Sequence, residues 1–308
     1  MGPEEAERTG RADLIGMSAP FDEFNPRLES VDAIGIDSGA TLVKVAMESS
    51  GGLYFATLRS PSTDRLRDHL ERTSPTHLCV TGCGAVALEA ELTGDRIRDI
   101  LSLIEFEAWA RGANEMLNRL GEPATEPYLL VSIGTGTSIL RVEGDQVERV
   151  GGTALGGGAA LGLGLALTGV ASSQELNELA LQGDRSSIDL MVSDLFENTE
   201  EIGAMIASGF GKLARNAALP ESERETPNPA DLASAAMGIV ADNIGLLVAA
   251  HARGAGVSRI VFGGSTLITH PQLELTIRGI AALGGFESSV LPHPGHPGAL
   301  GAMLMRRR

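Results

Sequence analysis

The hydrophobic pattern of this chain consists mainly of short apolar runs that end in glycine-containing turns. Runs of this length, rich in Val, Ile and Leu and bounded by turn residues, are typical of β-strands. Strands are therefore expected at about 32–37, 42–48 and 53–58 in the first half of the chain, and at about 128–133, 137–142 and 146–150 in the second. The first set is predicted to form a three-stranded antiparallel meander.

Other segments carry apolar residues at helical spacing. Helices are expected at about 64–72, 104–120, 158–168, 173–182, 186–195, 229–253 and 271–283, and from Pro297 onward. Further strands are expected at about 77–81, 258–262 and 286–291. Strands that alternate with helices in this way predict a mixed α/β protein.

The chain has 308 residues, enough for two α/β domains that each bury a core. Residues 1–30 are rich in Glu, Arg, Pro, Asp and Ser and show little periodicity, so we expect a flexible tail. Pro123 and Pro127 mark a break in the pattern. The sequence therefore predicts an N-terminal lobe over 31–125 and a C-terminal lobe over 126–308.

The first candidate site lies in the hairpin from Ile34 to Val45. Gly39 at its turn has no side chain to keep an anion from the backbone N–H groups, and Thr41 adds a hydroxyl donor. Asp37 at the strand end is expected to act as a catalytic and Mg²⁺-binding carboxylate, and Lys44 to neutralise a phosphoryl group. An ordinary glycine-turn hairpin is the alternative for this stretch alone.

A second copy of the pattern runs from Val131 to Arg141. It has an apolar strand, a glycine-centred turn, a hydroxyl residue, a second apolar strand and a cation, which suggests a duplicated domain. The matched positions are Asp37 with Gly134, Gly39 with Gly136, Thr41 with Ser138, and Lys44 with Arg141.

Two facing hairpins that hold one polyphosphate from both sides are typical of the actin, hexokinase and Hsp70 type of ATP-binding fold. We therefore predict an α/β protein of two duplicated actin-like, ribonuclease H-like lobes with the nucleotide in the cleft between them. A P-loop and a Rossmann fingerprint are not indicated, because no Gly-Lys-Ser/Thr or G-x-G-x-x-G follows a strand and opens a helix. The hairpin residues expected to bind ATP phosphates are Ser38, Gly39, Thr41, Lys44, Gly134, Thr135, Gly136, Thr137 and Ser138.

Two further glycine clusters are candidates for contact with the nucleotide. The stretch 151–164 is the most glycine-dense in the chain and is interpreted as a ligand loop that runs into a helix N-terminus. Gly263 and Gly264 follow a strand, where the backbone could pass close to a nucleotide base. The residues added to the ATP-binding set are Gly156, Gly157, Gly158, Gly263 and Gly264.

Composition narrows the possible partners. The net charge of −16 argues against nucleic acid or an anionic membrane, since both need a basic surface. Cys79 and Cys83 are too few for a disulfide framework or a four-ligand zinc site. No stretch is expected to reach the length of about 20 apolar residues that a membrane span needs, and the N-terminus lacks the order of a signal peptide. We expect a cytoplasmic protein.

Several motifs occur in one order from about residue 32 to 305. They are Asp37 to Lys44, Glu105 to Ala108 with Gly112, Val131 to Leu140, Arg149 to Gly158, Asp242 to Gly245, Val261 to Gly264 and Gly298 to Ala302. Together and in this order, they resemble the motifs of the type II pantothenate kinases, the eukaryotic-like branch of coenzyme A biosynthesis.

The resemblance implies ATP-dependent phosphorylation of pantothenate to 4′-phosphopantothenate, with ATP and Mg²⁺ as cofactors. Glu105 then holds the position of the catalytic carboxylate. Arg149 holds that of the residue that binds the pantothenate carboxylate, together with Gly152 and Thr153. From the residues alone, the dipole of the helix could explain both Glu105 and the nearby Glu107. The resemblance further implies a homodimer joined through helices and regulation by coenzyme A or its thioesters.

Two other functions stay open. One is a kinase of the same fold that acts on a sugar or amino sugar, and the other is a non-catalytic sensor of a nucleotide or acyl-coenzyme A. The sequence also departs from the family between Pro294 and Pro297, where relatives often have an aromatic residue, and at Ser265 and Thr266. These differences concern the acceptor pocket rather than the phosphate chemistry.

Overall fold

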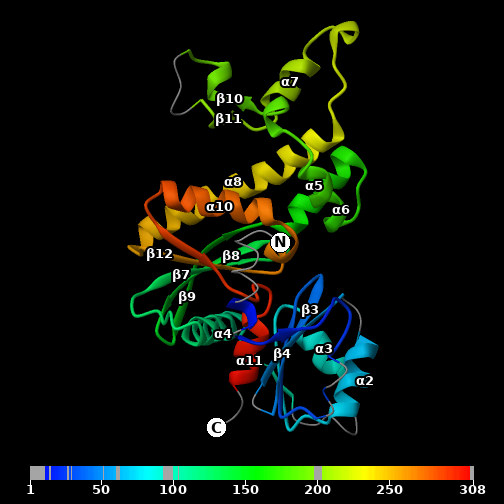
Figure 1. Ribbon diagram of the computed structural model, residues 1–308, viewed down its shortest axis with the longest axis vertical. Helices are drawn as coiled ribbons and strands as arrows, with labels where there is room; N and C mark the ends of the chain where they lie inside the picture. Colours follow the sequence, from blue (N-terminus) through cyan, green and yellow to red (C-terminus); the bar gives the residue numbers. More distant parts are fainter. Residues whose placement is uncertain are drawn as a thin grey trace.

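Two β-sheets lie one above the other along the long axis of the molecule, with two helices between them (Figure 1). The structure is a computed structural model. It describes residues 11–13, 15–25, 28, 30–50, 52–59, 63–92, 100–102, 104–197 and 203–305.

The first sheet begins with an antiparallel meander and continues with parallel strands on its other side. Its strand order is β1-β4-β3-β2-β5-β6. The strands are β1 (Met17–Ser18), β2 (Ala33–Ser38), β3 (Leu42–Ser49), β4 (Gly52–Arg59), β5 (His77–Thr81) and β6 (Ile100–Ser102), and the helices α2 (Thr63–Thr73) and α3 (Ala85–Leu92) lie on this lobe. The buried apolar faces of β2 and β3 explain why the short runs form central strands.

The second sheet repeats this arrangement. Its order β13-β12-β7-β8-β9 again places a meander beside two parallel strands. The strands are β7 (Tyr128–Ile133), β8 (Thr137–Glu143), β9 (Gln146–Thr153), β12 (Arg259–Gly263) and β13 (Glu287–Val290). The helices are α5 (Gly157–Thr168), α6 (Ser173–Ala180), α8 (Pro229–Ala255), α9 (Thr266–Thr269) and α10 (Pro271–Leu283). The duplication inferred from the hairpins therefore extends to the order of the strands.

The two sheets are joined by a pair of crossing helices, α4 (Glu105–Arg119) and α11 (Pro297–Leu304). Both have glycine at the crossing, because a Cβ at Gly112 would overlap the carbonyl oxygen of Pro297 and one at Gly301 would overlap that of Ala108. Although α11 follows the second sheet in the chain, it packs on β2, β3 and β5 of the first. The segment predicted as the C-terminal lobe thus completes the core of the N-terminal one.

Helix α8 corrects one expectation. It is long and apolar enough to cross a membrane, with a mean hydropathy of 1.7 over an 18-residue window. However, 61% of that window is buried inside the protein, where α5, α6 and α10 pack around it. The apolar composition of α8 is therefore explained by its place in the core.

The helix expected at 186–195 is wrong. The chain there forms two 3₁₀ turns, Arg185–Ser187 and Val192–Asp194, around the short strand β10 (Leu190–Met191). The carboxylates of Asp184 and Asp194 accept hydrogen bonds from the backbone N–H groups of Ser186 and Met191, which favours turns over a continuous helix.

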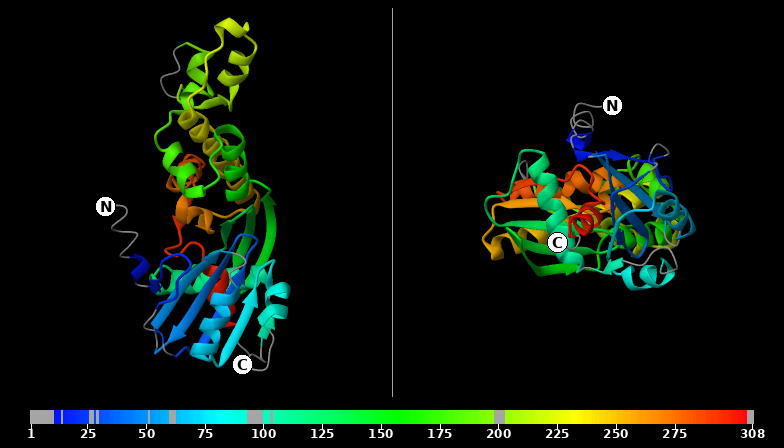
Figure 2. Two further views of the ribbon diagram at one scale, coloured as in Figure 1. Left: turned by 90° about the vertical axis from the view of Figure 1, so that its right-hand side faces the viewer. Right: turned by 90° about the horizontal axis from the view of Figure 1, so that it is seen from below.

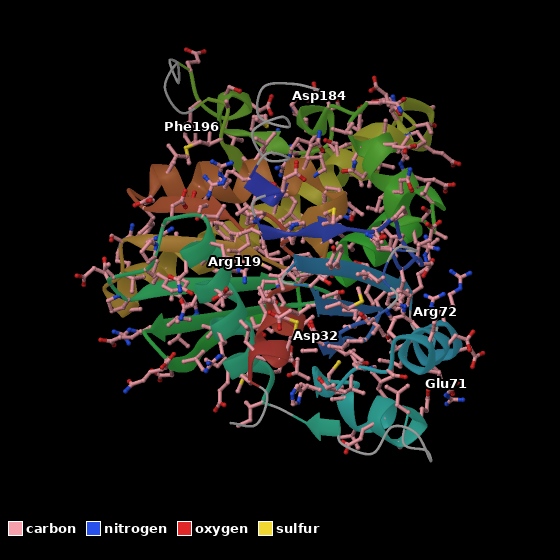
Figure 3. The ribbon with its side chains drawn as sticks, turned by 60° about the horizontal axis from the view of Figure 1, so that its bottom comes forward. Asp32, Glu71, Arg72, Arg119, Asp184 and Phe196 are labelled. Atoms are coloured by element: carbon pink, nitrogen blue, oxygen red, sulfur yellow. The ribbon has the colours of Figure 1, made fainter. Side chains whose placement is uncertain are left out.

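The segment that follows protrudes from the second lobe (Figure 2). It contains β11 (Ile206–Ser208), α7 (Gly211–Ala217) and a 3₁₀ turn at Glu221–Glu223. Asp184 and Phe196, which flank the two 3₁₀ turns before this segment, lie far from Glu71 and Arg72 on α2 (Figure 3).

Part of the predicted N-terminal tail is docked on the protein. β1 pairs in parallel with β4, Ile15 is buried, and Arg11 forms an ion pair of 3.0 Å with Glu122. Residues 1–10 lie outside the described residues. From Met17 to Asp22 the chain follows the edge strand β4, because the N–H groups of Ala19 and Asp22 also donate to the carbonyls of Phe55 and Thr57.

Candidate active site

The first hairpin carries a buried pair of opposite charges. Asp37 on β2 and Lys44 on β3 are cross-strand partners and are only 2% and 7% exposed. Lys44 Nζ lies 3.2 Å from Asp37 Oδ2, yet no group among the described residues is oriented to donate a hydrogen bond to this oxygen. This oxygen is paired with the Lys44 ammonium group but accepts no aligned hydrogen bond, so it retains a lone pair for a further donor or cation.

The backbone approaches Asp37 closely on two sides. A Cβ at Gly82, which follows β5, would lie 2.6 Å from Asp37 Oδ1, and one at Gly298, in the first turn of α11, would lie 2.6 Å from Oδ2. Two glycines therefore leave space around the carboxylate that any larger residue would fill. Neither glycine was assigned to the site from the sequence.

Glu105 opens α4 close to this pair. Burial raises the pKa of its carboxyl group above the ordinary value, the charge of Asp37 raises it further, and Lys44 opposes the shift. These effects show that the three side chains share one electrostatic environment. Glu107 is exposed, so the structure separates the two carboxylates that the helix dipole alone did not distinguish.

The turns of the two hairpins meet. Thr41 Oγ1 of the first turn and Thr135 Oγ1 of the second are 3.1 Å apart, and both residues are exposed. The N–H of Gly39 donates to the carbonyl of Leu42 (3.0 Å) and closes its own turn. Ser38 is buried and its carbonyl accepts a hydrogen bond from the N–H of Gly84. Of these residues, Thr41 and Thr135 present their hydroxyl groups at the junction of the lobes.

The residue-by-residue match of the two hairpins needs correction. Four residues separate the pair Ser38 and Val43 on the first hairpin, but only three separate Ile133 and Thr137 on the second. One pair further from the turn, Asp37 and Lys44 correspond to Ser132 and Ser138. The expectation that Arg141 takes the place of Lys44 is therefore wrong, and Arg141 forms an ion pair of 2.8 Å with Glu143.

The glycine-rich loop before α5 is packed on the second turn. The N–H groups of Gly157 and Gly158 donate to the carbonyls of Gly134 (2.8 Å) and Thr135 (3.0 Å). A Cβ at Gly156 would lie 2.7 Å from both carbonyl oxygens. The close approach of two protein loops thus accounts for these glycines, and the amide groups of Gly157 and Gly158 are already donors.

Hydroxyl groups beside the same loop also have protein partners. Thr137 is buried and donates to the carbonyl of Leu155 (2.8 Å). Thr153 accepts a hydrogen bond from the N–H of Leu155 (3.2 Å). In this conformation, both threonines hold the segment that leads into the glycine-rich loop.

Gly263 and Gly264 follow the same principle. Gly264 has a φ of 113°, and a Cβ there would overlap the backbone of Ile133. A Cβ at Gly263 would lie 3.0 Å from the ring of Trp109. These contacts explain why glycine stands at both positions, and the place of these glycines beside a nucleotide base stays a prediction.

Arg149 lies on β9 at an irregularity in the sheet. Ile139 pairs with Gly151 but Leu140 pairs with Arg149, so Val150 is an extra residue on the edge strand. The bulge places Arg149 opposite Leu140, which packs in the core beside α4. A Cβ at Gly152 would lie 2.5 Å from the guanidinium nitrogen, and no carboxylate among the described residues forms an ion pair with Arg149.

The donor groups suit a magnesium ion better than a protein-enclosed metal. No cluster of three or more His, Cys, Asp and Glu side chains occurs in the part of the chain that the structure describes. Mg²⁺ usually keeps several waters and binds one or two carboxylates together with substrate phosphates. Asp37, with its incompletely bonded oxygen, fits that coordination.

Sequence comparison identifies the relatives of this chain. A profile of the Fumble family matches residues 105–305. A protein named type II pantothenate kinase from Oceanobacillus iheyensis is 34% identical over 273 residues, which cover 88% of this chain and 98% of that protein. A second protein of that name, from Staphylococcus aureus strain USA300, is 27% identical over 278 residues, which cover 89% of this chain and 99% of that protein.

Solved structures support the fold. Component A of (R)-2-hydroxyglutaryl-CoA dehydratase from Acidaminococcus fermentans has a TM-score of 0.56 at 20% identity, and the match covers 90% of this chain and 98% of that one. The ROK family glucokinase from Streptomyces griseus, in complex with glucose and AMPPNP, has a TM-score of 0.54 at 14% identity. The match covers 89% of this chain and 99% of that one. The predicted two-lobed, actin-like ATPase fold is confirmed. The chain belongs to the type II pantothenate kinase family.

Proposed function

We propose that this protein transfers the γ-phosphoryl group of ATP to the primary hydroxyl of pantothenate and forms 4′-phosphopantothenate. The main structural support is the position of Glu105, a partly buried carboxylate of raised pKa beside Asp37 and Lys44. The 34% identity to a type II pantothenate kinase along almost its whole length supports pantothenate as the acceptor.

Each proposed role follows from the chemistry of phosphoryl transfer. A primary alcohol that attacks the γ-phosphoryl group must lose its proton, and Glu105 accepts it. The raised pKa makes Glu105 a stronger proton acceptor than an ordinary carboxylate. Lys44 and the hydroxyl groups of Thr41 and Thr135 bind the phosphates. Mg²⁺, when bound, neutralises phosphate charge, and Asp37 is the residue that would hold it directly or through water.

Arg149 orients the other end of the acceptor. A guanidinium group can bind a carboxylate through two parallel hydrogen bonds, and pantothenate has a single carboxylate. The bulge at Val150 and the absence of a side chain at Gly152 allow the guanidinium to lie on the side of β9 that faces α4.

The proposal is tested by measuring ADP release from Mg-ATP with and without pantothenate. Wild-type protein should show pantothenate-dependent turnover. Glu105→Gln should reduce kcat by about 10³-fold, within the range expected for loss of a general base, while calorimetry shows unchanged ATP binding. Glu107→Gln is the matched control, since this exposed carboxylate lies two residues along the same helix.

Two results would contradict the proposal. Near-normal turnover of Glu105→Gln would exclude its catalytic role. ATP binding without pantothenate-dependent turnover would exclude this acceptor, and a panel of sugars and amino sugars would then test the alternative kinase activity.

Three further properties belong to the same proposal. The protein acts in the cytoplasm, as a homodimer joined through helices of the second lobe, and coenzyme A or its thioesters bind as regulators. Exposed leucines on these helices, Leu165 on α5 and Leu246 on α8, support the dimer. Light scattering measures the oligomeric state, and inhibition of ADP release by added coenzyme A tests the regulation.

A further inference from the structure

The charged pair of the first hairpin is part of a longer row of polar side chains. Asp37, Lys44 and Thr57 are register partners on the adjacent strands β2, β3 and β4. Their side chains therefore lie on one face of the sheet, with neighbouring Cβ atoms about 5 Å apart. All three are buried, with Thr57 6% exposed. A row of buried polar groups at this depth needs a partner at each end.

His296 is the partner at the β4 end. Its Nε2 lies 3.2 Å from the carbonyl oxygen of Ala56 and 3.2 Å from Thr57 Oγ1. A carbonyl only accepts hydrogen bonds, so Nε2 carries the hydrogen and donates to Ala56, and Thr57 shares the same donor. Nδ1 is then the unprotonated nitrogen of the ring.

The neutral form of His296 suits a position near Lys44. Burial, the neighbouring His293 and the charge of Lys44 together lower the pKa of His296 to about 3. The imidazole therefore carries no charge at neutral pH, and Lys44 is the cation of the row. A neutral donor can hold Thr57 without repelling the ammonium group.

His296 also fixes the start of α11. It is the residue immediately before Pro297, and its carbonyl accepts the helical hydrogen bond from the N–H of Leu300 (2.9 Å). Gly298, in the first turn of this helix, is the residue that approaches Asp37 Oδ2. The imidazole of His296 thus connects β4 to the N-terminus of α11, which lies next to the carboxylate of Asp37.

His293 holds this loop from the opposite side. Its Nε2 donates to the carbonyl of Ala12 (3.1 Å), and its Nδ1 accepts a hydrogen bond from Ser18 Oγ (3.0 Å). The rings of His293 and His296 both pack against Phe55, at centroid distances of 4.5 and 5.0 Å. The N-terminal segment that contains Ala12 and Ser18 therefore packs against the loop that carries His296 and stabilises it.

We propose that His296 is a positioning residue of the phosphate site. Through Thr57 and the start of α11, it holds Lys44 and Asp37 in the geometry that binds the phosphates of ATP, and His293 keeps it in place. This inference rests on the phosphate-binding role proposed above for Asp37 and Lys44.

The test measures ATP affinity by calorimetry in the absence of any acceptor, beside the KM for pantothenate. His296→Phe keeps a buried ring but removes the donor, and we expect the Kd for ATP to rise about tenfold with little change in the KM for pantothenate. His296→Gln supplies an amide N–H in place of Nε2 and should restore the Kd to within about threefold of wild type.

The matched control is His69→Phe. His69 is also buried in the first lobe and stacks on Phe24 at 3.8 Å, but it lies on α2 outside the row. This variant should lower the melting temperature without changing the Kd for ATP. A folded His296→Phe protein with wild-type ATP affinity would overturn the proposal, and so would failure of His296→Gln to bind better than His296→Phe.

A second variant covers the case in which His296→Phe does not fold. Thr57→Val removes the hydroxyl but keeps the β-branched shape, and it should raise the Kd for ATP about threefold. An unchanged Kd would overturn the proposal. Failure of the proposed kinase activity would look different, because wild-type protein would then bind ATP but release no ADP with pantothenate.

Discussion

In the first lobe, the second strand pair from the hairpin turn consists of Asp37 and Lys44, both buried and oppositely charged. In the second lobe, the same positions hold Ser132 and Ser138. The order β4-β3-β2-β5-β6 in the first sheet matches β9-β8-β7-β12-β13 in the second, and the first sheet has β1 as an additional edge strand. The two lobes therefore share one backbone arrangement, but only the hairpin of the first lobe has a charged pair at these matched positions.

The turns differ in a related way. The second turn carries the glycine-rich loop, whose N–H groups donate to the carbonyls of Gly134 and Thr135. The first turn is closed by its own hydrogen bond from the N–H of Gly39 to the carbonyl of Leu42, and the carbonyl of Ser38 beside it accepts a hydrogen bond from the N–H of Gly84. The first hairpin carries the charged pair. The second hairpin has neutral side chains at the matched positions, and its turn packs on the glycine-rich loop. The two hairpins are therefore expected to respond differently to equivalent substitutions.

The strongest test of this difference substitutes the matched strand positions. Asp37→Asn should reduce kcat for pantothenate-dependent ADP release by about 10³-fold, because it removes the charge expected to bind the metal and leaves Lys44 without its partner. Ser132→Ala should reduce kcat by less than about threefold, since it removes only a neutral hydroxyl. Equal losses in the two variants would contradict the division of roles.

The connection between the lobes gives the next largest effect. Gly301→Ala places a Cβ on the carbonyl of Ala108 where α4 and α11 cross. We expect the free energy of unfolding to fall by about 3 kcal/mol, because two helix backbones must separate. Gly162→Ala on α5, where a Cβ meets no atom within 4 Å, is the control and should stabilise the protein by about 0.5–1 kcal/mol. Urea unfolding measures both, and similar values would show that the crossing is not tightly packed.

A smaller effect is expected where the second lobe meets the acceptor. Gly152→Ala should displace the guanidinium of Arg149, because the new Cβ would lie 2.5 Å from it. The KM for pantothenate should rise about tenfold, corresponding to about 1.4 kcal/mol, while the KM for ATP stays within about twofold. Steady-state kinetics with each substrate varied in turn measures both KM values. A rise in the KM for ATP with an unchanged KM for pantothenate would contradict the proposed role of Arg149.

The smallest expected effect is a displacement of the pH profile. Glu105 must be deprotonated to accept a proton, so kcat/KM should fall as the pH drops through its pKa, which burial and Asp37 raise. Because Lys44 opposes that shift, the acid limb of Lys44→Met should lie at higher pH than that of wild type. Ser138→Ala, on the second hairpin, should leave the limb in place. If the acid limb of the pH profile stays in place in Lys44→Met, the charge of Lys44 does not influence the pKa of Glu105.

Local patterns in the sequence predicted most strands closely. The expected strand at 42–48 is β3 (Leu42–Ser49), and the expected helix at 271–283 is α10 (Pro271–Leu283). Apolar runs and glycine turns are local signals, so the chain alone was enough. The sequence also placed Asp37 and Lys44 on one hairpin, whereas their pairing across the strands is a finding of the structure.

Features that depend on register or on distant contacts were not predictable in the same way. The match of Arg141 to Lys44 failed because one turn is a residue shorter, and a change of one residue alters which side chains share a face. Glycines at 156, 157, 263 and 264 were assigned to the nucleotide, which stays a prediction, but the sequence did not show that a Cβ there would meet backbone or side-chain atoms of the protein. Sequence alone shows that space is needed at a glycine, but not what occupies it.

The position of α11 has a consequence for how the protein is made. The inner face of the first sheet is covered by Ala299, Leu300 and Met303, although the second sheet is synthesised before them. While the chain emerges from the ribosome, β2, β3 and β5 must therefore remain without their apolar cover until almost the whole second lobe has been translated. The first lobe is not an independent folding unit during translation, and chaperones that bind exposed apolar strands have the longest opportunity to act on it.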